Sequence, residues 1–217
     1  FQNKRFKYID RFIYNYYDHI IAITPKVKEA IINHTGILPD KVEVIQNGIS
    51  LSKIDEANPY SKFHISSRIK TSDKIILQVS SFQEPKDHET LIKAMLLLPN
   101  YFKLILVGEG LLKEKCEKLV ALLGLEKRVF FLGVRMDIPQ LLKTADIVVL
   151  SSKYEGLSLS SIEGMASGKP FVASDVPGLK EVVTDAGILF PLGDEKKLAE
   201  EILHLSNDTD HYNATVA

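Results

Sequence analysis

The chain has 217 residues, of which 45% are hydrophobic and 25% are charged, and a formal net charge of −1. This length suits one large domain, or one domain with part of another, and the balanced charge gives no global attraction to nucleic acid. The single cysteine, Cys116, excludes a disulfide within the chain, as expected in a reducing compartment. No apolar run approaches the ~20 residues of a membrane span, and no signal peptide is present, so we expect a cytoplasmic protein.

The first 46 residues are predicted to be the remnant of a preceding domain and a linker. An aromatic, basic helix is predicted over residues 4–17, followed by a short strand, a helix begun by Thr24 and Pro25, and a second short strand. One strand–helix pair cannot close a sheet of its own. The helix at 4–17 has the composition of a membrane-surface helix, which makes the inner face of the membrane an alternative location, but packing against a partner domain is favoured. The chain begins at Phe1 rather than methionine, so we expect a fragment or a processed form.

Residues 47–206 alternate between apolar strands and amphipathic helices. Strands are predicted at 74–80, 102–108, 128–133, 146–152, 170–174 and 188–190, and helices at 87–98, 111–124, 137–145, 160–168, 178–183 and 194–205. Near-continuous apolar strands separated by helices are typical of a parallel sheet covered on both faces. The fold class is therefore predicted to be α/β, a Rossmann-like doubly wound parallel sheet. Residues 207–217 are polar, and we expect a frayed tail.

The candidate site residues lie where predicted strands end. Ligands of such sheets bind beyond the carboxyl ends of the strands. Ser80, Gly108, Gly133 and Glu155 each follow a strand end closely. We therefore expect them to converge on one edge of the sheet.

Two glutamates bracket the segment EGLSLSSIE. Glu155 is predicted to lie in a loop and Glu163 in the following helix, and the segment between them is small and glycine-bearing. A helix start with free backbone N–H groups attracts phosphate, and nearby carboxylates can accept hydrogen bonds from sugar hydroxyls. This pattern predicts a nucleotide-sugar site. Two structural alternatives remain open: Ser160 and Glu163 have the spacing of a capping box, and Glu155 has the character of a solvated loop carboxylate.

The amides of Gly156, Leu157 and Ser158 are candidate donors to a diphosphate, with a plain helix-entry turn as the alternative. Lys86 follows the first strand of the sheet and could neutralise the same diphosphate. Its alternative is a surface lysine at a helix start, where a cation is mildly unfavourable.

Cofactor and metal sites find little support. Gly108 and Gly110 follow a strand, but Lys113 stands where a dinucleotide fingerprint has its third glycine, so a turn that lets a nucleotide approach the backbone fits better. Asp208 and Asp210 form a D-x-D pattern only in the polar tail. The histidines show no ligand spacing, and one cysteine cannot build a zinc site. We expect no cofactor and no metal.

Several segments together resemble the family 4 glycosyltransferases, which have the two-domain GT-B fold. The strongest is EGLSLSSIEGMASGKPFVASDVPGLKEVV, which looks like the E-x7-E segment of that family. VIQNGIS, SSFQEPKDHETLIKA, LILVGEGLLKEK, VFFLGVRMDIPQLLKTADIVVLSS and GILFPLGDEKKLAEEI are similar to other segments in the same order. The resemblance identifies residues 47–206 with the C-terminal, donor-binding domain and residues 1–46 with the end of the acceptor domain.

The resemblance also implies roles. Glu155 should contact the donor sugar, and Glu163 should accept hydrogen bonds from the ribose hydroxyls. The remaining donor-binding residues that it implies are Lys86, Gly156, Leu157 and Ser158 at the diphosphate, and Val134 and Arg135 beside the base. From their places after predicted strands, Ser81 and Gly108 are further candidate donor-binding residues. Family members retain anomeric configuration and generally need no metal.

This sequence departs from the family at Ser80 and Ser81, where Gly-Arg is usual, so one phosphate-binding arginine is missing, and at Ser50, where an acid is usual. The predicted function is donor binding in a retaining hexosyltransferase. It would move a sugar from a nucleotide-diphosphate sugar to a glycan or lipid-linked acceptor in bacterial surface polysaccharide synthesis. The acceptor would bind the domain expected before Phe1, and the chain alone should bind donor weakly and transfer nothing. A non-catalytic nucleotide-binding module and a nucleotide-sugar epimerase are the alternatives.

Overall fold

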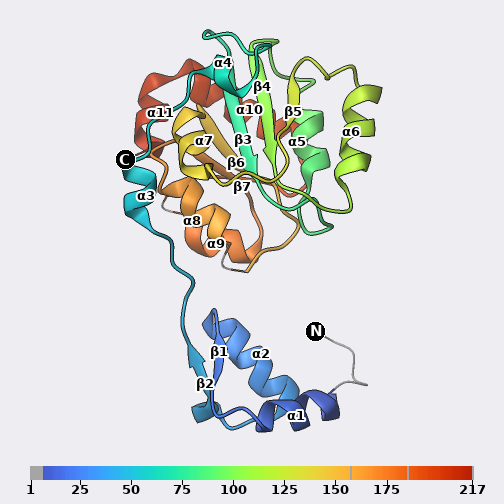
Figure 1. The fold of residues 1–217 in the computed structure, drawn as a ribbon, viewed down its shortest axis with the longest axis vertical. Coiled ribbons are helices and arrows are strands. Elements are labelled where there is room, and N and C mark those ends of the chain that lie inside the picture. The colour runs from blue at the N-terminus through green and yellow to red at the C-terminus, as the bar shows by residue number, and fades with distance from the viewer. Residues whose placement is uncertain (1–6, 157, 185, 217) are drawn as a thin grey trace. The chain divides into compact units, whose positions relative to one another are not determined.

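The computed structural model describes residues 7–156, 158–184 and 186–216. The chain divides into two compact units, a first unit of Phe1–Gly48 and a second unit of Ile49–Ala217. Each unit is described by itself (Figure 1). Within the described residues, no helix combines the length and apolar character needed to cross a membrane.

The first unit is a small α/β fragment. Its elements are α1 (Lys7–Asn15), β1 (Ile20–Ala22), α2 (Pro25–Thr35), a 3-10 turn η1 (Pro39–Lys41) and β2 (Val42–Val44). β1 and β2 pair in parallel. The Thr24 hydroxyl accepts a hydrogen bond from Val27 N at 3.2 Å, which confirms the predicted helix start. Among residues 8–48, the buried apolar side chains are Ala22, Ile37 and Val42.

The second unit is a doubly wound parallel sheet, as predicted. Its strands are β3 (Lys74–Val79), β4 (Phe102–Val107), β5 (Val129–Phe131), β6 (Ile147–Leu150), β7 (Phe171–Ser174) and β8 (Ile188–Phe190). Its helices are α3 (Leu51–Asp55), α4 (Lys62–Ile65), α5 (His88–Ala94), α6 (Lys113–Leu122), α7 (Ile138–Thr144), α8 (Leu159–Met165), α9 (Pro177–Val183), α10 (Glu195–Asn207) and α11 (Thr209–Val216). The strand order is β5-β4-β3-β6-β7-β8, and every pairing is parallel.

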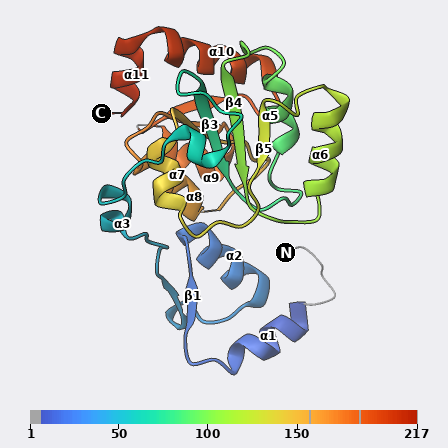
Figure 2. The same cartoon turned by 45° about the horizontal axis from the view of Figure 1, so that its top comes forward.

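Helices cover both faces of this sheet (Figures 1 and 2). Along β3, Ile76 belongs to one hydrophobic cluster, and its neighbours Ile75 and Leu77 belong to the other. The first cluster includes apolar side chains of α5, α6 and α10, and the second includes those of α7 and α9. Because side chains alternate along a strand, burial on both faces requires the continuous apolar runs that the sequence shows.

The C-terminal tail differs from the prediction. Residues expected to fray form α11, and α10 continues to Asn207. Asp208 begins the helix, because its carboxylate accepts a hydrogen bond from His211 N at 2.9 Å. The Tyr212 hydroxyl donates to Asp146 O at 3.3 Å, which ties the helix to the start of β6. The polar composition of the tail concealed this cap.

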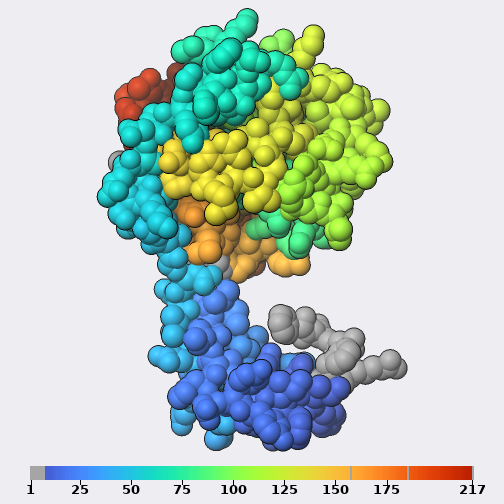
Figure 3. All heavy atoms as spheres, viewed as in Figure 1, coloured from blue at the N-terminus to red at the C-terminus, as the bar shows by residue number. Residues whose placement is uncertain are grey.

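The strand order places a topological switch point between β3 and β6. Here the chain turns to opposite sides of the sheet, so the loops that follow the two strands diverge and leave a crevice. The loop after β5 borders the same carboxyl edge, and the segment that leads into α7 lies at the surface, shown in yellow in Figure 3. These three loops carry most of the predicted site residues.

Candidate functional site

Lys86 and Glu155 meet at the switch point. Lys86 lies in the loop between β3 and α5, and Glu155 lies in the loop between β6 and α8. The Lys86 ammonium forms an ion pair with Glu155 Oε1, and the two side chains are only 16% and 10% exposed. The Ser152 hydroxyl donates to the same carboxylate oxygen at 2.9 Å. Neither residue is a solvated surface group. This excludes the alternative of a surface lysine for Lys86 and the alternative of a solvated loop carboxylate for Glu155.

Backbone contacts fix the two loops against each other. Lys86 and Ser152 form an isolated antiparallel bridge. Lys153 N donates to Pro85 O at 2.8 Å, and Asp87 N donates to Ser151 O at 2.9 Å. The positions of the Lys86 and Glu155 side chains are therefore set by strand-like pairing rather than by free loops.

Glu163 is not a capping residue. α8 begins at Leu159 with Ser158 as its N-cap, so Ser160 lies inside the helix and the proposed capping box does not form. Glu163 stands more than a turn into the helix, half-buried, and burial raises the pKa of its carboxyl group. A carboxylate in this setting gains from hydrogen-bond donors such as hydroxyl groups.

The start of α8 is only partly described. Leu157 lies outside the described residues, so its predicted amide contact has no structural account. The Ser158 side chain makes no capping hydrogen bond, and its carbonyl accepts from Ser161 N at 3.1 Å and from the Ser161 hydroxyl at 2.7 Å. Gly156 is exposed. A role for these amides at a diphosphate stays a prediction.

Gly178 is a residue that the sequence analysis did not single out. It lies at the start of α9, and a Cβ atom there would stand 1.8 Å from Glu155 O and 3.0 Å from Gly156 O. Both contacts are with backbone, which cannot move aside cheaply. Only glycine lets α9 approach the loop that carries Glu155.

Gly108 and Gly110 serve a contact within the chain. Their φ angles are +142° and +154°, and a Cβ on Gly108 would lie 2.1 Å from Ser80 O. A Cβ on Gly110 would lie 2.4 Å from Phe82 O. The loop after β3 therefore accounts for both glycines without a bound nucleotide, and a contact of Gly108 with donor stays a prediction. Ser81 is exposed, whereas Ser80 is buried.

The loop after β5 presents apolar side chains rather than a free cation. The Arg135 guanidinium pairs with both carboxylate oxygens of Asp137, Nε lying 2.7 Å from Oδ1. This pairing holds the pKa of the Asp137 carboxyl group well below its usual range. Val134 and Met136 are 69% and 93% exposed. If the loop flanks a base, these apolar side chains are the available contacts, and Met136 was not among the predicted residues.

In the part of the chain that the structure describes, one cluster could supply metal ligands. Ligand atoms of Glu201, His204 and His211 lie within 4.8 Å of one another, although the sequence showed no ligand spacing. The two imidazole rings stack with centroids 4.0 Å apart and planes 11° apart, so their lone pairs lie in two nearly parallel planes that do not meet at one ion. One ring would have to turn before both could bind one ion. The D-x-D pattern is no part of this cluster, since Asp208 caps α11.

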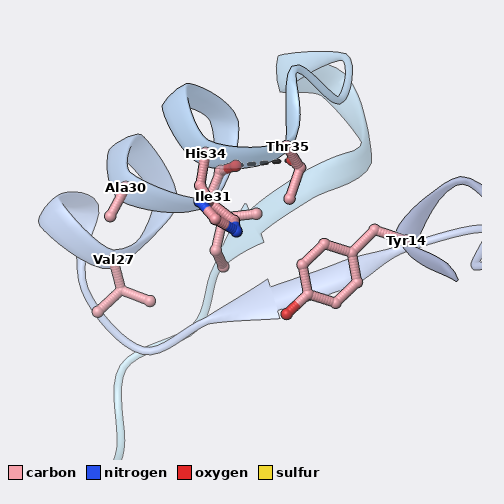
Figure 4. A pocket seen from close by; sticks show the side chains of 6 residues that line it. All are labelled: Tyr14, Val27, Ala30, Ile31, His34 and Thr35. Atoms are coloured by element: carbon pink, nitrogen blue, oxygen red, sulfur yellow. Dashed lines mark hydrogen bonds between the residues drawn. The ribbon is translucent and has the colours of Figure 1, made fainter. Parts of the chain in front are cut away.

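A cavity of about 200 Å³ lies in the first unit (Figure 4). Its lining comes from α1 and α2 and is mostly apolar, and it consists of Tyr14, Val27, Ala30, Ile31, His34 and Thr35. The Thr35 hydroxyl donates to Ile31 O at 2.7 Å within its own helix. Of the predicted donor-binding residues that the structure describes, none lines this cavity.

Comparisons with known proteins match the two units of the chain to two different family models. The family described as glycosyl transferases group 1 matches residues 60–216, and the family described as Glycosyltransferase Family 4 matches residues 1–53. An uncharacterised glycosyltransferase of Methanocaldococcus jannaschii is 34% identical over 171 residues, which cover 76% of this chain and 44% of the relative.

Two further proteins carry more specific names. N-acetylgalactosamine-N,N'-diacetylbacillosaminyl-diphospho-undecaprenol 4-alpha-N-acetylgalactosaminyltransferase of Campylobacter jejuni is 27% identical over 93% of this chain and 54% of that protein. The crystal structure of Anabaena HepE in complex with UDP-glucose matches with a TM-score of 0.81 and 28% identity, over 99% of this chain and 61% of that one. The chain spans about half the length of the curated relatives it matches, at 44% and 54%. With the matched family model covering most of its residues, the chain belongs to the group 1 glycosyl transferases.

Proposed function

We propose that the second unit binds the donor of a retaining glycosyltransferase, a nucleotide-diphosphate sugar. The observation that carries this proposal is the Lys86–Glu155 pair, buried at the switch point of a doubly wound sheet. In such a donor, the bond that breaks joins the diphosphate to the sugar, so one charged residue can serve each side of it. The cation suits the diphosphate, and the carboxylate suits the sugar.

The proposed chemistry places charge on the leaving group. When the bond between the anomeric carbon and the diphosphate oxygen breaks, the departing diphosphate gains negative charge. The Lys86 ammonium would stabilise that charge, and Glu155 would contact the transferred sugar. Without ligand, Lys86 and Glu155 neutralise each other. Donor binding would replace part of this ion pair with contacts to phosphate and to sugar. Protein groups would stabilise the negative charge of the diphosphate, and no metal is proposed.

Glu163 would accept hydrogen bonds from the ribose hydroxyls. Its half-buried carboxyl group has a pKa raised by burial, so donors from a bound ribose would favour the charged form. The base would lie along the loop after β5, near Val134. UDP is the first nucleotide to test, because HepE was crystallised with UDP-glucose.

The acceptor would bind through another domain, of which the first unit would be the C-terminal part. The Campylobacter relative is named for a diphospho-undecaprenol-linked acceptor. A glycan or lipid-linked acceptor in bacterial surface polysaccharide synthesis, at the inner face of the membrane, is the corresponding proposal here. On its own, the 217-residue chain would bind donor weakly and transfer nothing.

A second candidate is a nucleotide-binding module without transfer activity. Ser81 favours it, because this residue is exposed and uncharged at the position where related enzymes usually have arginine. A missing charge-assisted hydrogen bond of about 1.5–3 kcal/mol would lower donor affinity ten- to a hundredfold. In the full-length protein, Glu155→Gln would abolish sugar transfer by an enzyme and leave a module's binding largely intact.

Calorimetric titration of the chain with UDP, GDP and ADP tests the donor site. We expect saturable binding of one nucleotide, weakened about tenfold or more by Lys86→Met and by Glu163→Ala. Matched controls are Lys118→Met and Glu114→Ala, whose exposed side chains pair with each other on α6. Equal weakening by the controls, or no binding by any of the three nucleotides at millimolar concentration, would overturn the proposal.

A further inference from the structure

Four buried polar side chains form a hydrogen-bonded set that reaches the backbone carbonyl of Lys86. They are Gln78, Ser80, His88 and Ser151. Gln78 and Ser80 come from the end of β3, His88 begins α5, and Ser151 follows β6. A buried polar group costs free energy unless it is hydrogen-bonded, and an apolar core would be at least as stable. A set of four at one place therefore needs a reason beyond stability.

The hydrogen bonds of this set run in one direction. Lys86 O can only accept, so His88 Nδ1, 3.2 Å away, carries the hydrogen. In the neutral ring Nε2 then accepts, and the Ser80 hydroxyl, 3.1 Å away, donates to it. Ser80 Oγ in turn accepts from Gln78 Nε2 at 3.0 Å. Ser151 N donates to Gln78 Oε1 at 3.0 Å, which fixes the orientation of that amide.

A protonated His88 would disrupt this order of hydrogen-bond donors and acceptors. Both ring nitrogens would then donate, and Ser80 Oγ would have to accept from His88 and from Gln78 together. The hydroxyl hydrogen of Ser80 would lose its acceptor in the network. The hydrogen-bond pattern therefore requires a neutral ring with the hydrogen on Nδ1.

The imidazole ring of His88 is also held by packing. It stacks on Phe82, with ring centroids 4.1 Å apart and planes 13° apart. Phe82 is fully buried, its N–H donates to Glu109 O, and its carbonyl accepts from Leu112 N, both at 2.9 Å. The ring cannot rotate without disturbing the loops after β3 and β4.

We propose that His88 positions Lys86 for the diphosphate of the donor, and that Ser80 and Gln78 fix the tautomer of His88 for this role; the three are here called the Gln78–Ser80–His88 network. This inference rests on the proposed function, in which Lys86 binds that diphosphate. The three side chains are buried, so they act through Lys86, whose backbone carbonyl the network holds. A lysine placed in advance binds phosphate without the cost of ordering its loop. His88 is thus a positioning residue.

Two amide variants separate the two hydrogen bonds of His88. In His88→Asn the amide nitrogen falls near the position of Nδ1 and can still donate to Lys86 O. In His88→Gln the amide falls near the position of Nε2, so the bond to Ser80 is kept and the bond to Lys86 O is lost. The two variants are otherwise alike in polarity, and both lose the ring that stacks on Phe82.

The test is calorimetric titration of the 217-residue chain and its variants with UDP, and with uridine as the probe that lacks a diphosphate. We expect UDP affinity to fall about tenfold in His88→Gln and to stay within about threefold of the parent in His88→Asn. Uridine affinity should not change. In a Lys86→Met background the effect of His88→Gln should disappear, because the residue through which His88 acts is gone. A purely structural role would weaken UDP and uridine alike and would persist in that background.

The outcomes distinguish this inference from the proposed function. If UDP, GDP and ADP all fail to bind the parent chain, the proposed function fails and the inference with it. If UDP binds through Lys86 and His88→Gln binds like the parent, only the inference fails. Nitrogen-15 chemical shifts of the parent provide a test that needs no variant. We expect a neutral His88 with its hydrogen on Nδ1, and a hydrogen on Nε2 would overturn the inference.

Discussion

The loops that border the carboxyl edge of the sheet are held in two different ways. The loops after β3 and β6 are joined by a backbone bridge and by buried hydrogen bonds, and their central ion pair is almost enclosed. The loop after β5 is exposed, and its arginine is held by a neighbouring aspartate within the same loop. The first region has the rigidity that a reaction centre needs. The second presents the exposed side chains of Val134 and Met136, which fits a role beside a base.

The largest effect is expected from crowding the first region. In Gly178→Ala, the new Cβ would stand 1.8 Å from Glu155 O, so the loop that carries Glu155 or the start of α9 must move. We expect a loss of about 3 kcal/mol in the free energy of unfolding, together with loss of UDP binding. Urea denaturation and calorimetry would measure the two effects.

Gly48→Ala is the matched control for this change. A Cβ at Gly48 meets nothing within 4 Å, so its effect should stay within about 0.5 kcal/mol. Unchanged stability and UDP affinity in Gly178→Ala would show that the loop of Glu155 is not rigid, and the comparison between the two regions would fail.

The next-largest effect is expected in the pH dependence of the free energy of unfolding, which reports on the buried hydrogen bonds of the first region. Burial lowers the pKa of His88 from 6.5 to about 4 in the folded chain. Between these values the unfolded chain binds more protons than the folded chain. The contribution of a neutral His88 to stability is therefore complete above about pH 6.5 and is lost as the pH falls towards 4. The total is about 3 kcal/mol, from 1.36 kcal/mol per pKa unit.

Urea denaturation at pH 7.5 and pH 5, with and without His88→Asn, measures this contribution. The parent should lose more stability than the variant over that interval, because the variant has no titrating group at this position. Equal losses would mean that His88 titrates like a solvent-exposed histidine and that the buried network is not closed.

The smallest effect is expected in the second region. Arg135→Ala removes the ion-pair partner of Asp137. The two side chains are 33% and 23% exposed, and ion pairs near the surface contribute about 0–1 kcal/mol. UDP affinity should change by less than about fivefold. Met136→Ala, which shortens the exposed apolar side chain, should have a comparable effect if this loop flanks the base. A hundredfold loss of affinity in Arg135→Ala would mean that the guanidinium leaves Asp137 to bind the donor.

Much of the fold could be predicted from the sequence, because strand and helix patterns are local. The alternation of apolar runs with amphipathic segments gave the order of elements, and each predicted strand of the sheet is present. The polar tail was misjudged, since its composition hid the cap at Asp208 and the hydrogen bond of Tyr212 to Asp146, 66 positions away.

The sequence by itself determined that Lys86 and Glu155 would meet at one edge, because parallel strands bring their carboxyl ends together. Only the tertiary structure decided how they meet, as an ion pair between residues 69 positions apart. It also decided that Gly108 makes room for Ser80 and that His88 supports Lys86. Contacts of this kind join side chains and backbone from different loops, and no local pattern in the sequence records them.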